Sequence, residues 1–163
     1  IMDVTEERSL AKKLFNACWE LIEKEDRTPE EDLEMIHLAH ASRWHWSNVG
    51  GRKEFAIGEW QCSRVHALLG HGDSAYMHAT RSVELSEEFP RPNFMIASAT
   101  EALAFAEYIR GNLEEAKRLK DKALELLKDE SELIRILNNG ADKARVLASK
   151  TLKDSYKALG ILG

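Results

Sequence analysis

The sequence is poor in cysteine and proline, with two residues of the first and three of the second among 163. Two cysteines, Cys18 and Cys62, are too few for a disulfide scaffold, and each lies within a helical pattern, so we expect half-buried free thiols. No apolar run approaches the roughly 18 residues that a membrane-spanning helix needs. The charged start of the chain, from Asp3 to Arg8, does not resemble a secretory signal. We therefore expect a cytoplasmic protein that makes no contact with a membrane.

A sustained alternation of apolar and polar residues is also missing, and with it the pattern typical of β-strands. Aliphatic residues, alanine, glutamate and lysine are abundant, which favours an all-α fold. Clusters of basic residues are missing too: the net charge is −5, and both signs are mixed along the chain. A nucleic-acid-binding domain normally carries a basic face, so we expect no such partner. The length suits one domain with a substantial core, and we assign residues 1–163 to a single domain.

Capping residues and stop signals divide the chain into helices. Asp3, Thr28 with Pro29, Asp73 and Asn112 are expected to cap helix N-termini. Glycines and the Phe89–Pro92 segment are expected to end helices or separate them. The expected hairpins of two helices cover about residues 4–48, 53–88 and 93–128, and C-terminal capping helices cover about 131–159. We expect the sixth helix to end near Lys128 and seven or eight helices in all, with one kinked helix over 131–159 as the alternative.

Two segments of the chain are alike over the length of a helical hairpin. Equivalent positions are 41 residues apart throughout, and they pair as follows: Gly70 with Gly111, Ala75 with Ala116, and Ser82 with Ala123. Each segment has an apolar helical stretch, a glycine, a short polar turn, an alanine, and then a second helix with a pair of one small and one large residue. A helix-turn-helix unit repeated in register predicts stacked hairpins.

The segment Gly111-Asn-Leu-Glu-Glu-Ala116, followed by Ala123-Leu-Glu-Leu126, resembles the turn and second helix of the tetratricopeptide repeat. The resemblance implies a superhelical array of antiparallel hairpins. Three features depart from the family pattern: the spacing is 41 residues and not about 34, His66 and Glu107 replace a large aromatic residue, and Lys120 replaces a large apolar one.

The same resemblance implies a concave groove lined by the first helix of each hairpin. When the family's groove positions are aligned with this sequence by its glycines, they fall on Trp60, Arg64, Glu101, Phe105 and Tyr108. Aromatic side chains beside charged ones suit the capture of a peptide or a helix. The alternative is that Trp60 and Phe105 belong to the core between hairpins. The implied function is a non-catalytic protein-interaction module, whose partner could also be a second copy of the chain in a homodimer.

Histidine and tryptophan are concentrated in the second expected helix. His37, His40 and Trp44 share one face of it, and His66 lies on the following helix. This cluster supports the alternative function of a small-ligand or metal-binding helical bundle. Two histidines on one helix give only two metal ligands, and a third would have to come from elsewhere, such as Glu59 or His66. We therefore expect no bound metal and no cofactor.

Catalytic motifs are not evident in the sequence. Gly70-His-Gly-Asp-Ser74 lacks the strand context and spacing of a nucleophile elbow. Gly50-Gly-Arg-Lys53 lacks the glycine spacing of a phosphate-binding loop. Both segments are more simply explained as helix ends, so we expect no catalytic residue and no enzymatic activity.

Overall fold

The computed structural model describes residues 1–90 and 93–137, and within these ranges it contains six α-helices and no β-strand. The all-α prediction is confirmed for this part of the chain. The helices are α1 (Val4–Glu23), α2 (Pro29–Val49), α3 (Arg52–Leu68), α4 (Gly72–Glu87), α5 (Phe94–Ile109) and α6 (Leu113–Leu137). None of these six helices is both long and apolar enough to cross a lipid bilayer.

The helix ends predicted between residues 128 and 137 were wrong. We expected a helix to end near Lys128 and a short one to follow over 131–137, but α6 continues without a break to Leu137. A reason lies in the buried Glu130 carboxylate, which accepts a hydrogen bond from the backbone N–H of Asn93. This contact ties the second half of α6 to the start of α5. The helix expected near residues 142–159 lies outside the described residues.

The N-termini of α1 and α2 are capped as expected. The Asp3 carboxylate accepts hydrogen bonds from Thr5 N and Glu6 N, at 2.7 and 2.9 Å. Thr28 Oγ1 accepts from Glu31 N at 3.2 Å, and Glu31 Oε2 accepts from Thr28 N at 2.9 Å. These reciprocal bonds satisfy backbone donors that a helix start otherwise leaves without partners.

The expected cap of α4 was wrong. The helix begins at Gly72, with His71 at the N-cap position, so Asp73 lies in the first turn and not before it. The Asp73 carboxylate is paired with Arg110 at the end of α5, at 3.0 Å from Nε. Asp73 therefore joins two hairpins, and its charge still suits the positive end of the α4 dipole.

Gly70 and Gly111 end α3 and α5 in the same conformation. Their φ angles are 77° and 87°, and no non-glycine residue described has a positive φ. Gly70 N donates to Ala67 O, and the next residue's N–H donates to His66 O. Gly111 and the residue after it repeat this pair of bonds, to Tyr108 O and Glu107 O. Both ends are Schellman caps, in which a left-handed residue is normally glycine.

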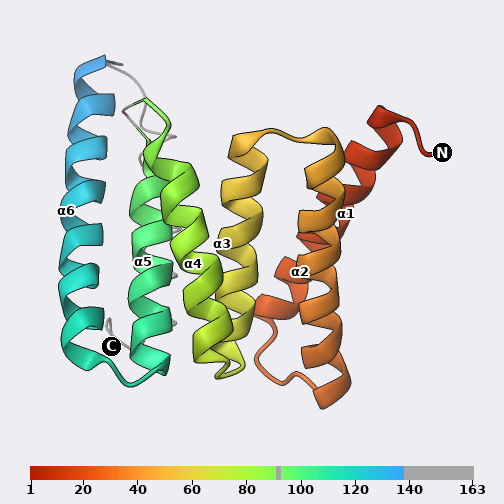
Figure 1. Ribbon diagram of the computed structural model, residues 1–163, viewed down its shortest axis with the longest axis horizontal. Coiled ribbons are helices and arrows are strands. Elements are labelled where there is room, and N and C mark those ends of the chain that lie inside the picture. The colour runs from red at the N-terminus through yellow and green to blue at the C-terminus, as the bar shows by residue number, and fades with distance from the viewer. Residues whose placement is uncertain (91–92, 138–163) are drawn as a thin grey trace.

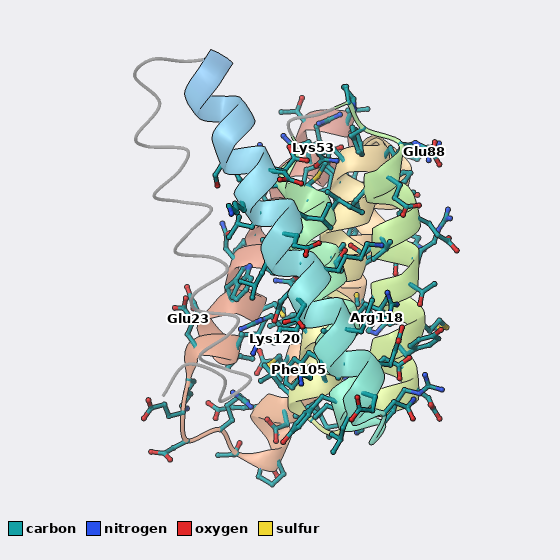
Figure 2. All side chains as sticks on the ribbon, turned by 90° about the vertical axis from the view of Figure 1, so that its left-hand side faces the viewer. Glu23, Lys53, Glu88, Phe105, Arg118 and Lys120 are labelled. Carbon is teal, nitrogen blue, oxygen red and sulfur yellow. The ribbon has the colours of Figure 1, made fainter. Side chains whose placement is uncertain are left out.

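Consecutive helices lie side by side and run in opposite directions (Figure 1). Packing joins the members of each pair, α1 with α2, α3 with α4, and α5 with α6, and also joins α2 with α3, α4 with α5, and α3 with α5. Helix α6 lies at one end of the layer, nearest the viewer in Figure 2, and carries Arg118 and Lys120. Lys120, one of the departures from the family pattern, is only half-buried there.

The small residues at the repeated positions are buried. Ala75 and Ala123 are 0% exposed, Ser82 is 1% exposed and Ala116 is 8% exposed. The Ser63 hydroxyl donates to Ala75 O at 2.8 Å, and the Ser82 hydroxyl donates to Ala56 O at 2.9 Å. These bonds join α3 and α4 directly, because no larger side chain separates their backbones.

The two cysteines are free and fully buried, in a core cluster with Met35, Ala39 and Val65. The expectation of free thiols is confirmed, although both are more deeply buried than expected. Burial raises the pKa of the Cys18 thiol to about 12 and raises the pKa of the Cys62 thiol as well. Such thiols remain protonated and are poor nucleophiles.

Candidate functional site

The two expected groove residues on α3 lie against α1. Trp60 is half-buried, and its ring centroid lies 5.4 Å from that of Trp19. Arg64 is 7% exposed, and its guanidinium lies over the same Trp19 ring, 5.8 Å from the centroid. The Arg64 guanidinium therefore packs against α1 through a cation–π contact.

The three expected groove residues on α5 differ in exposure. Glu101 is buried, and Phe105 packs in a core cluster with Ala67, Ala75 and Ala106. Tyr108 is 52% exposed. Of the five residues expected to line the groove, Tyr108 offers the largest surface to a partner. The role of these five residues in binding stays a prediction.

A compact group of histidines lies between α2, α3 and α4. His40, His66 and His78 each bring a ring nitrogen within 4.8 Å of the other two. The closest pair is His40 Nε2 and His66 Nε2, which are 2.9 Å apart. The rings of His66 and His78 are parallel within 2°, with centroids 5.6 Å apart. Three helices therefore direct one imidazole each toward a common point.

Glu59 on α3 orients this group from one side. Its Oε2 accepts a hydrogen bond from His78 Nδ1 at 2.7 Å, and its Oε1 accepts from Arg43 Nε at 2.8 Å. Burial acts to raise the pKa of the Glu59 carboxyl, but the hydrogen bond and charge of His78, together with Arg43, hold it below its usual value. Glu59 is therefore ionised at neutral pH, with both oxygens engaged.

Two histidines of the cluster, His66 and His40, have lowered pKa values that favour the neutral form. Burial, aided by the positive charges that His40, His78 and His71 would carry, lowers the pKa of His66 to about 4. Burial is also the largest cause of the lowered pKa of His40, with His78 adding to it and Glu59 opposing it. A neutral imidazole keeps a lone pair, which can accept a proton or bind a metal ion.

An open cavity of about 770 Å³ adjoins the cluster. Its lining comes from α2, α3 and α4: His37, His40, Ala41, Arg43, Trp44, Ser47, Glu59 and His78. Trp44 is 62% exposed at this cavity. The residues that the sequence grouped, His37, His40 and Trp44, thus share one cavity, but His37 is exposed and lies outside the close group of three.

His78 is the member that the sequence did not reveal. It has no motif around it, and the only available signal was its place on the helix that pairs with α3 across the Gly70 turn. Glu59 and His66, by contrast, were both considered as partners of the α2 histidines. The packing of α4 on α3 brings His78 to them, and no local pattern encodes that contact.

The histidine group should make stability depend on pH in chelator-treated protein. The pKa of His66 is lower in the folded chain than in the unfolded chain, so the unfolded state binds more protons as the pH falls below about 6.5. The contribution of His66 to the free energy of unfolding is therefore highest near pH 7.5, where His66 is neutral in both states, and it falls progressively toward pH 4. Between pH 7.5 and 5.5, His66 alone should account for a loss of about 1.3 kcal/mol.

Urea denaturation of the wild-type chain and of His66→Gln at both pH values measures this effect. The variant should lose less stability than the wild type over the interval, by about the amount attributed to His66. Equal losses in the two proteins would show that His66 is not the group responsible.

Comparison with known proteins gives only a short local similarity. No family model matches the chain, and no solved structure matches it. The chain is similar to the tryptophan--tRNA ligases of Rickettsia typhi and Rickettsia bellii, with 40% and 42% identity over 57 residues. These residues are 35% of this chain, and they span 16% of the length of either ligase. A stretch of this size does not place the chain in the ligase family.

Proposed function

We propose that this chain is a non-catalytic helical-repeat module that binds a peptide or a helix. The observation that supports it best is the repeated hairpin. Gly70 and Gly111 have the same left-handed conformation and the same backbone bonds, and a buried alanine follows each glycine by five residues. Hairpins repeated in register stack into arrays that offer an extended binding surface.

In this proposal, the α3–α4 and α5–α6 hairpins are two copies of one tetratricopeptide-like unit, and α1–α2 is a third, less regular copy. The contact of α3 with α5 fits an array in which the first helices of successive hairpins line one face. With a net charge of −5, the partner is a protein segment or a second copy of this chain, and not a nucleic acid. The setting we propose is the cytoplasm.

In this proposal, the five groove residues have different roles, which follow their exposure. Tyr108 is the exposed anchor, and the half-buried Trp60 offers part of its ring. Arg64, Glu101 and Phe105 are buried, and we propose that they support the face without contacting the partner directly. Binding hot spots commonly consist of a rigid aromatic side chain surrounded by well-packed residues.

Replacing Tyr108 with alanine should weaken binding with little effect on stability. An aromatic hot spot contributes about 2 kcal/mol, which corresponds to a roughly 30-fold weaker Kd. The measurement is calorimetric titration with peptides selected against the wild-type chain from a displayed random library. Sedimentation equilibrium tests the same variant for loss of self-association.

Met77→Ala is the matched control, because Met77 is 60% exposed on α4, the second helix of its hairpin. It should bind the selected peptides like the wild type. Equal affinity of the wild type and Tyr108→Ala for every selected peptide, with no dimer at high concentration, would contradict the proposed face.

A further inference from the structure

His40, His66 and His78 have the arrangement of a metal-ligand set. We propose that they form a site for one divalent transition-metal ion of the zinc class, with three imidazole ligands and a fourth position open to solvent. The proposal goes beyond peptide binding and does not depend on it. It also replaces the expectation from the sequence that the chain binds no metal.

The distances between the nitrogens suit such an ion. Imidazole nitrogens bound to tetrahedral zinc at about 2.0–2.1 Å lie roughly 3.3 Å from one another. The His40 and His66 Nε2 atoms are 2.9 Å apart, and all three ligand nitrogens lie within 4.8 Å. Small side-chain rotations would bring them to coordination distance without a change in the helices.

The donor type selects the class of metal. Neutral imidazole nitrogen suits zinc, cobalt, nickel and copper, whereas magnesium and calcium prefer oxygen ligands. The three imidazoles belong to three different helices, α2, α3 and α4, which are held by the packing of α2 on α3 and of α3 on α4. Ligands held on packed helices lose little entropy when an ion binds.

Glu59 supplies the orienting contact that such sites normally contain. A metal-bound histidine usually donates its other ring N–H to a carboxylate, which fixes the ring and makes the ligand nitrogen more basic. His78 Nδ1 makes this bond to Glu59 Oε2, so its Nε2 remains as the ligand atom. Arg43 holds the second Glu59 oxygen, and its guanidinium also lies 4.6 Å from the centroid of the Phe55 ring.

The cavity beside the cluster leaves room for a fourth ligand. His40, His78 and Glu59 all line it, and its volume of about 770 Å³ far exceeds that of a water molecule. Three protein ligands with an open position are typical of zinc sites that exchange water for a small molecule, in contrast to closed structural sites with four protein ligands. Water is therefore the expected fourth ligand.

Calorimetric titration of tag-free, chelator-stripped protein with Zn²⁺ tests the site. We expect one ion per chain in the wild type. His40→Gln, His66→Gln and His78→Gln should each weaken the affinity more than 100-fold. Glu59→Gln removes the charge but keeps an oxygen acceptor for His78, so it should weaken the affinity by less than the roughly 10–100-fold that complete loss of an orienting partner costs. His37→Gln is the control, because His37 lines the same cavity outside the group of three, and its affinity should equal that of the wild type.

Circular dichroism and melting in chelator verify that each variant is folded. If His66→Gln does not fold, the more exposed His78 carries the test, and Co²⁺ absorption provides an independent readout of three nitrogen ligands in a tetrahedral field. Failure of the wild type to bind Zn²⁺ would overturn the proposal. So would Zn²⁺ binding that all three histidine variants retain. Tyr108→Ala should leave Zn²⁺ affinity unchanged, which separates this proposal from the peptide-binding one.

Discussion

Replacing Glu59 with leucine should lower the free energy of unfolding by about 3 kcal/mol, measured in urea with a chelator present. Glu59 accepts hydrogen bonds from Arg43 and His78, and its side chain is 12% exposed. Removing one member of a buried ion pair leaves the other charge desolvated, which typically costs about 3–5 kcal/mol. The Arg43 side chain is 21% exposed, which places the expected cost at the lower end.

Two further variants identify the cause of this loss. Glu59→Gln keeps an oxygen acceptor and the shape of the side chain, so it should lose less stability than Glu59→Leu. The double variant Arg43→Leu/Glu59→Leu should recover part of the lost stability, because it leaves no unpaired guanidinium. A loss below about 1 kcal/mol in Glu59→Leu would mean that the Arg43–Glu59–His78 contacts hold the cluster only weakly.

Enlarging Ala75 to leucine should cost about 3 kcal/mol or more, at the upper end of the usual range for overpacking. Ala75 is 0% exposed and packs with Ala67, Phe105 and Ala106. Its carbonyl accepts the Ser63 hydroxyl at 2.8 Å, so α3 and α4 have no space between them at this point. Three added carbon atoms would force the two helices apart.

The change equivalent to Ala75→Leu in the α5–α6 hairpin is Ala116→Leu, and the two losses of stability can be compared. Ala116→Leu should also destabilise the chain, by roughly 1–3 kcal/mol, and by less than Ala75→Leu because Ala116 is 8% exposed. Lys117→Leu is the control on the exposed side of α6 and should be near neutral. Melting and urea curves that show no loss for either alanine variant would contradict the equivalence of the two hairpins.

Local patterns were enough to predict the all-α class and most of the helix ends among the described residues. Thr28 with Glu31, and Gly70 and Gly111, act through backbone atoms a few residues away, so the sequence contains all the information that fixes them. The errors arose where a distant contact decided the outcome. Asp73 pairs with Arg110 and not with the backbone of its own helix, and Glu130 ties the end of α6 to Asn93.

The candidate sites depend even more on contacts between residues that are distant in the sequence. Helical spacing placed His40 and Trp44 on one face correctly, because both lie on α2. Spacing could not reveal that His78 joins His40 and His66, since this depends on how α4 packs on α3. Nor could it show that Arg64 lies over Trp19, since that contact depends on the packing of α1 against α3.

The central claim is that α3 and α5 form a peptide-binding face around Tyr108, and chemical-shift mapping with a selected peptide tests it most directly. In ¹⁵N-labelled protein, we expect the peptide to cause the largest changes in amide chemical shift on α3 and α5, near Trp60 and Tyr108. Residues near Met77 on α4 should change little. Shifts confined to the cavity around Trp44, or to the exposed side of α4, with the amides around Tyr108 unchanged at saturation, would contradict the claim.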